Sequence, residues 1–114
     1  MELDIELCRD ILKEIVKEGG AYGLNRFPHI EGKDDDFVFY QIRKMQEAGY
    51  VKYKRYMSET PYDIFKIEII FQGHQFLNQM LDDTIWAKIK KTAKKESIPL
   101  TFEGIKVLIS LFFS

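Results

Sequence analysis

The spacing of apolar residues predicts two amphipathic helices in the first half of the chain. In the first helix, over residues 2–18, apolar side chains recur every three or four positions. Gly19 and Gly20 follow, and glycine adopts the left-handed conformation that often ends a helix. The second helix is predicted over residues 34–48 and ends at Gly49. Its first turn holds Asp34, Asp35 and Asp36, which suit free backbone N–H groups and the helix dipole.

Alternation of apolar and polar residues predicts a β-hairpin after this helix. The two strands are expected over residues 50–56 and 63–71, because both segments are rich in tyrosine, valine, isoleucine and phenylalanine. The connecting turn contains Ser58, Glu59, Thr60 and Pro61. We expect the following side chains of the second strand to face the core: Phe65, Ile67, Ile69 and Phe71. A further short strand over residues 27–31 would lie at a sheet edge, because Pro28 has no N–H to donate.

Three more helices are predicted over residues 72–81, 84–95 and 102–113. Asp82 or Asp83 is expected to cap the second of these, and Thr101 the third. The expected core comprises Leu12, Ile42, Met45, Phe76, Leu77 and Trp86. The order of elements predicts an α+β, mainly helical protein: a winged helix-turn-helix-like domain with a two- to three-stranded β-wing and extra C-terminal helices. A single domain would span residues 1–114, with the winged-helix core at 1–81 and a helical extension at 82–114.

Four short runs resemble an uncharacterised bacterial and phage family, a domain of unknown function with a winged-helix-like fold. These runs are IEG (30–32), YQIRKMQEAGYV (40–51), GHQFL (73–77) and DDTIW (82–86). That family usually has Thr-Trp-Glu-Gly-His where this chain has Ile70, Phe71 and Gln72 before Gly73 and His74. The usual helix cap is therefore absent at Ile70. The resemblance implies the fold, a cytoplasmic setting and a phage or mobile-element origin, and it implies no reaction, ligand or site residue.

Composition narrows the function classes. The 114 residues fit one domain, and the formal net charge is -1, from 17 Lys+Arg and 18 Asp+Glu. Nucleic-acid binding would therefore depend on a local basic patch. Cys8, the only cysteine, cannot form an internal disulfide and is expected to be a buried apolar side chain. The chain shows no signal-peptide pattern and no apolar stretch long enough to cross a bilayer, so we expect a cytoplasmic protein without membrane contact.

Catalytic chemistry has little support. The chain contains no glycine-rich phosphate loop, His-Glu-x-x-His helix or serine elbow. His29 and His74 are far apart in sequence, and for His74 a structural role is favoured over a metal or acid–base role. Helix capping is favoured over metal binding for the three aspartates, because consecutive helical residues point in different directions. We therefore expect no enzyme activity, no cofactor and no metal.

Six basic and aromatic residues are candidates for binding DNA. In a winged helix, the helix over 34–48 is the recognition helix, and the strand after it contacts the nucleic-acid backbone. The candidates are Tyr40, Arg43 and Lys44 on the helix, with Lys52, Lys54 and Arg55 on the strand. A solvated helix face and an edge strand protected by lysine explain the same residues. A basic run at residues 88–95 is either a solvated face or a phosphate-contacting patch.

Two binding functions therefore remain open. One is a DNA-binding transcriptional regulator, and the other is a protein-interaction module that keeps the fold without binding DNA. The final helix bears on both, because its apolar residues occupy a wide arc. Phe102, Ile105, Leu108, Ile109 and Phe112 are expected to face inward. Val107, Leu111 and Phe113 would then either form a homodimer interface or pack against the first helix of their own chain.

Overall fold

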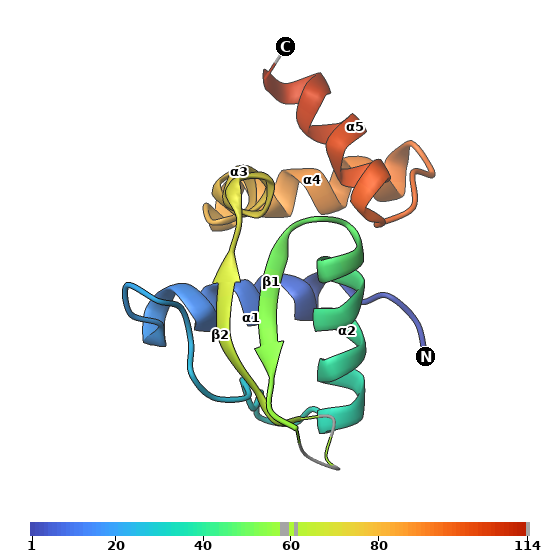
Figure 1. The fold of residues 1–114 in the computed structure, drawn as a ribbon. Coiled ribbons are helices and arrows are strands. Elements are labelled where there is room, and N and C mark those ends of the chain that lie inside the picture. Colours follow the sequence, from blue (N-terminus) through green and yellow to red (C-terminus); the bar gives the residue numbers. More distant parts are fainter. Residues whose placement is uncertain (58–59, 61, 114) are drawn as a thin grey trace.

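The structure, a computed structural model, describes residues 1–57, 60 and 62–113. These residues form an α+β, mainly helical protein with five helices and one two-stranded antiparallel sheet (Figure 1). In chain order the elements are α1 (Ile5–Glu18), α2 (Asp35–Glu47), β1 (Val51–Arg55), β2 (Ile64–Ile69), α3 (Phe71–Met80), α4 (Asp83–Lys95) and α5 (Phe102–Phe113). The hairpin lies beside α2, while α3, α4 and α5 gather at the end of the hairpin away from its tip (Figure 1).

Side-chain caps begin several of the helices. The carboxylate of Asp34 accepts a hydrogen bond from the Asp36 N–H at 2.8 Å, which confirms the predicted capping role. Asp82 caps α4, and the Thr101 hydroxyl accepts from a backbone N–H in the first turn of α5. Ile70 precedes α3 without a side-chain cap, as its departure from the family pattern suggested.

The glycines that end the first two helices act in different ways. Gly49 adopts a φ of 80°, the left-handed conformation expected after α2. Gly19 has φ -80° and ψ 146°, so the predicted left-handed stop after α1 is wrong. A Cβ at Gly19 would lie 2.4 Å from the carbonyl oxygen of Ile15. Glycine is therefore needed at position 19 for close backbone approach rather than for a positive φ.

The hairpin contains an irregularity that breaks the alternation of its strands. Val51 pairs with Ile69 and Lys52 with Glu68, but the register shifts before Lys54 pairs with Phe65. Lys66 lies in this irregular region with a φ of 50°, which few residues with a side chain adopt. Ser58, Glu59 and Pro61 of the predicted turn lie outside the described residues.

This irregularity changes which side chains of β2 face the core. Ile67 and Ile69 are buried as predicted, and Ile64 is buried as well. Phe65 is only partly buried, and Phe71 is 74% exposed at the start of α3. The predicted inward orientation of Phe65 and Phe71 is therefore wrong, because neither residue continues a regular alternating strand.

The connection between α1 and α2 lies against the hairpin without forming a regular strand. The predicted strand over 27–31 is wrong; instead Leu24 forms an isolated antiparallel bridge with Ile67 of β2. Residues 19–34, all described, contain no helix. The short turn of a helix-turn-helix therefore does not join α1 to α2.

A single buried cluster connects all five helices and the hairpin. It includes all six predicted core residues, which confirms that prediction: Leu12, Ile42, Met45, Phe76, Leu77 and Trp86. Cys8 is also fully buried, as expected, and burial raises the pKa of its thiol to about 12. The thiol is therefore protonated and unreactive near neutral pH.

Polar contacts fasten α4 to α1. The Trp86 indole N–H donates to Glu6 at 2.9 Å, and the Lys90 ammonium lies 2.7 Å from the same carboxylate. These contacts lower the pKa of Glu6, with the Lys90 hydrogen bond as the largest cause. Arg9, 9% exposed, donates to the Met80 carbonyl at 2.7 Å and also pairs with the Asp83 carboxylate.

Within the part of the chain that the structure describes, no helix is long and apolar enough to cross a membrane.

Candidate functional site

The six predicted DNA-binding residues lie on α2 and β1, which are neighbours in the fold (Figure 1). We use the name α2–hairpin face for the exposed region of these two elements that the six residues mark: Tyr40, Arg43, Lys44, Lys52, Lys54 and Arg55. Because side chains alternate along a strand, Lys52 and Lys54 project from the side of β1 opposite to Arg55, which lies over Phe39 of α2. Arg43 of α2 and Arg55 of β1 both lie close enough to Tyr53 to lower its pKa, against the larger effect of burial, which raises it. The assignment of the six residues to DNA binding stays a prediction.

One carboxylate of the same chain, that of Glu47, partly compensates the two positive charges on α2. The Glu47 carboxylate lies 3.2 Å from the Lys44 ammonium and 3.8 Å from the Arg43 guanidinium. Both cations also lie over the Tyr40 ring, at 5.3 Å for Lys44 and 5.9 Å for Arg43. A cation that already has an anion beside it contributes less to attracting a polyanion.

The hairpin part of this face is compensated only in part. The Lys52 ammonium lies 3.3 Å from the Glu68 carboxylate on β2. Lys54 and Arg55 are exposed, and no carboxylate of the described residues lies within ion-pair distance of either. Arg55 instead lies over the Phe39 ring of α2, 6.0 Å from its centroid. The free positive charge of the α2–hairpin face is therefore concentrated on the last two residues of β1.

The N-terminal end of α2 is acidic. Asp34, Asp35 and Asp36 stand there together, and the Asp35 carboxylate lies 3.0 Å from Nδ1 of His29. In a recognition helix this end usually approaches the base edges, and carboxylates repel phosphates.

His74, which lies at the start of α3, has an exposed side chain. No group of three or more histidine, cysteine, aspartate or glutamate residues in the described chain is placed to hold a metal.

Aromatic residues extend the α2–hairpin face beyond the predicted set. Phe39 receives Arg55 on its ring and makes an edge contact with Tyr62, at a centroid distance of 6.0 Å. Tyr56 is 56% exposed and stacks on Phe65 at 4.2 Å. Neither Phe39 nor Tyr56 belongs to the six residues predicted from the sequence. The sequence shows that both segments are rich in aromatic residues. Which of these residues join the face depends on how α2 packs on the hairpin.

The basic run on α4 is separate from this face. Lys88, Lys91, Lys94 and Lys95 are exposed, whereas Lys90 pairs with Glu6 and lies 5.8 Å from the Trp86 ring centre. Helix α4 lies at the end of the hairpin away from its tip (Figure 1). The run therefore belongs to a different element and a different end of the molecule from the hairpin tip.

The outer side of α5 is apolar and exposed. Phe102, Ile105 and Leu108 are buried as predicted, but Phe112 is 39% exposed, so its predicted inward orientation is wrong. Val107 and Leu111 are 51% and 60% exposed. The alternative in which α1 of the same chain covers them is therefore wrong. The side chain of Phe113, the third residue of the predicted dimer interface, lies outside the described part of the structure.

These features define a mainly helical α+β protein whose most distinctive surface joins a helix to a β-hairpin. The chain belongs to the family described as "Hypothetical protein (DUF2513)", which matches residues 2–99. It is also 27% identical over 114 residues to an "Uncharacterized protein" of Haemophilus influenzae, covering 100% of this chain and 97% of that protein. No solved structure matches the chain. The resemblance to an uncharacterised family is confirmed, whereas the winged-helix assignment depends on the arrangement of elements alone.

Proposed function

We propose that this protein is a non-catalytic, winged-helix-like module that binds another protein through the α2–hairpin face. The order of its elements supports the winged-helix-like assignment. A helix, α1, is followed by Leu24 in a bridge to β2, then by α2 and the two-stranded hairpin. Gly49 turns the chain from α2 into β1, as expected between a recognition helix and a wing.

We favour a protein partner over DNA because carboxylates lie beside several cations of the α2–hairpin face. Glu47 lies beside both Arg43 and Lys44, and Glu68 lies beside Lys52. A nucleic-acid surface needs cations that are free to replace counterions on phosphates. The remaining character of the face is aromatic and arginine-rich, with Tyr40 among its members, and such residues are enriched in protein interfaces and their hot spots.

Site-specific photo-crosslinking in the native cells tests this proposal. A photoreactive p-benzoylphenylalanine would replace Tyr40 on the face or, as a matched control, Tyr22, which is 75% exposed in the α1–α2 connection. We expect one discrete protein adduct from position 40 that is absent from position 22. The Arg43→Glu substitution in the position-40 protein should remove the adduct, because it reverses the charge at the centre of the face. A nucleic-acid adduct, or the same adducts from both positions, would contradict the proposal.

Binding of duplex DNA is the second candidate, and Lys54 and Arg55 favour it. Both are exposed on the wing strand, and neither has a carboxylate partner among the described residues. A winged helix commonly uses its wing to contact the phosphate backbone. Two free cations attract DNA only weakly, however, because each phosphate that a cation neutralises releases only about one counterion.

Homodimerisation through α5 stays a prediction, and the exposure of Val107 and Leu111 supports it. A two-fold interface would cover these side chains by placing the same patch of each copy against the other. Sedimentation equilibrium should then show a dimer at micromolar concentration, and Leu111→Glu should give a folded monomer. A monomeric unmodified protein, or a folded Leu111→Glu dimer, would contradict this prediction.

A further inference from the structure

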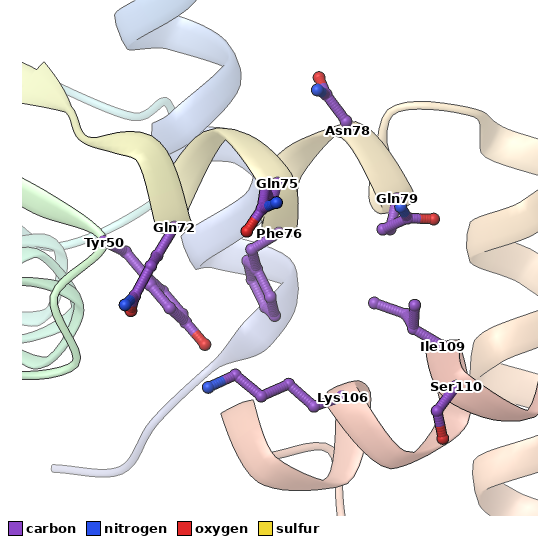
Figure 2. Close-up of a pocket in the computed structure, with 9 residues that line it drawn as sticks. All are labelled: Tyr50, Gln72, Gln75, Phe76, Asn78, Gln79, Lys106, Ile109 and Ser110. Atoms are coloured by element: carbon purple, nitrogen blue, oxygen red, sulfur yellow. The ribbon is translucent and has the colours of Figure 1, made fainter. Parts of the chain in front are cut away.

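A groove with a volume of about 690 Å³ lies between α3 and α5 (Figure 2). Its volume falls within the range of sites that bind small molecules or short peptide segments. The groove lies at the end of the hairpin away from the tip, and none of the residues of the α2–hairpin face lines it. It is therefore a separate candidate site, whatever the α2–hairpin face binds.

The floor of the groove is aromatic and contains a hydroxyl group without a partner. The Tyr50 ring stacks on Phe76 at 4.8 Å and makes an edge contact with Phe102 at 4.9 Å. Tyr50 is 1% exposed, and its hydroxyl has no hydrogen-bond partner among the described residues. A buried hydroxyl of this kind is unfavourable until an acceptor or donor reaches it.

Lys106 of α5 covers this floor. Its ammonium lies 5.6 Å from the centre of the Tyr50 ring, and Figure 2 shows the ammonium and the Tyr50 hydroxyl pointing toward each other from opposite sides. The lysine is exposed, so it is free to move aside when a ligand enters. An acceptor placed between the two groups would receive hydrogen bonds from both. No carboxylate lines the groove, which leaves Lys106 as its one charged lining residue among the described positions.

The α3 wall of the groove is built from amides. Gln72, Gln75, Asn78 and Gln79 all line it (Figure 2). From position 72 to position 79 a helix rises about 10 Å, which is roughly the length of three residues of extended chain. Each glutamine offers both a donor and an acceptor, which match the C=O and N–H groups of a peptide backbone. The wall therefore suits an extended peptide.

The α5 wall combines a charge with an apolar side chain. Ile109 lines the groove one helical turn after Lys106, and the Cβ atoms of residues at this spacing are about 5–6 Å apart. In an extended peptide, side chains two positions apart point to the same side and are separated by about 6.6 Å. An acidic residue and an apolar residue two positions apart would thus face Lys106 and Ile109 together.

We propose that the α3–α5 groove binds an extended segment of another protein that carries an acidic residue and an apolar residue two positions apart. The carboxylate accepts from Lys106 and from the Tyr50 hydroxyl. The peptide backbone pairs with the glutamine amides of α3, and the apolar side chain lies on Ile109. This site does not depend on the partner of the α2–hairpin face.

NMR titration of the ¹⁵N-labelled full chain tests the proposal. The probes are acetyl-Glu-Ala-Leu-amide, its neutral counterpart acetyl-Gln-Ala-Leu-amide, and N-acetylglutamate. We expect the acidic peptide to shift the side-chain amide resonances of Gln72, Gln75 and Gln79. It should bind about fivefold more tightly than the neutral peptide, the magnitude of an exposed lysine–carboxylate pair. N-acetylglutamate should bind more weakly than the acidic peptide, because it lacks the backbone and the apolar side chain.

Variants separate the contributions to this binding. Lys106→Gln should remove the preference for the acidic peptide, whereas Lys88→Gln, an exposed lysine on α4, should leave it intact. Tyr50→Phe should weaken the acidic peptide more than the neutral one. Equal binding of the two peptides, or the absence of shifts at these glutamines, would overturn the proposal. N-acetylglutamate binding as tightly as the acidic peptide would replace the peptide with a small carboxylate as the ligand.

Discussion

Replacement of Tyr50 by phenylalanine should stabilise the protein, although it removes a polar group from the centre of the fold. The aromatic contacts with Phe76 and Phe102 are made by the ring and would be kept. Only the hydroxyl is lost, and it has no hydrogen-bond partner among the described residues. Burial of an unsatisfied polar group costs about 1–3 kcal/mol, so we expect Tyr50→Phe to raise the free energy of unfolding by about 1 kcal/mol. In a protein of this size that change raises Tm by about 4 °C.

Urea unfolding followed by circular dichroism measures this difference directly. Tyr22→Phe is the matched control, because Tyr22 is 75% exposed and its hydroxyl is hydrated in both states. The control should leave the unfolding midpoint unchanged. A Tyr50→Phe variant that is less stable than the unmodified protein by about 1 kcal/mol would show that the hydroxyl has a partner. It would also remove one of the supports for a ligand in the α3–α5 groove.

Three further substitutions test how the elements are held together, each measured by urea unfolding. Gly73→Ala should lower the free energy of unfolding by about 3 kcal/mol, because the alanine Cβ would lie 2.1 Å from the Tyr50 carbonyl oxygen. The higher helix propensity of alanine is too small to offset this clash. A neutral effect would contradict this packing. Gln41→Leu should lower the free energy of unfolding by about 2–3 kcal/mol, since the fully buried amide accepts a hydrogen bond from the Asp4 N–H at 2.8 Å. A loss below about 0.5 kcal/mol would refute this prediction. Glu6→Gln should cost about 0.5 kcal/mol at neutral pH, because this carboxylate is half exposed. The pKa of Glu6 is lowered below its ordinary value of 4.5, so its contribution is present above that pH and disappears as the pH falls through the folded-state pKa. An equal loss at a pH below the folded-state pKa, where the carboxylate is protonated, would contradict the assignment to charge.

The helices and the core were predictable because local pattern and burial agree there. Helical spacing placed α1, α2 and α4 within a few residues of their bounds, and the six expected core residues are buried. The caps at Asp34 and Thr101 followed from residue type and position alone. In these segments each local preference supports the same fold.

The features that were missed depend on contacts between elements. Regular alternation predicted an inward Phe65, but a lysine with positive φ at position 66 accompanies a shift in strand register that the pattern does not indicate. The compensation of Arg43 and Lys44 by Glu47 was accessible from helical spacing. By contrast, the pairing of Lys52 with Glu68 requires the strand register. The α3–α5 groove is tertiary, since its floor and its two walls come from three separate segments.

The affinity for duplex DNA decides between the two binding proposals, because we infer that the α2–hairpin face has too little free positive charge for a nucleic-acid partner. The measurement is the fluorescence anisotropy of a labelled random-sequence duplex titrated with the full chain at about 50 mM salt, where electrostatic binding is strong. We expect a dissociation constant weaker than about 10⁻⁴ M, the weak end of non-specific DNA binding. The opposite result would contradict this inference: micromolar binding that weakens steeply with added salt. In that case the Lys54→Ala and Arg55→Ala variants would lose the binding, and Lys88→Ala would retain it.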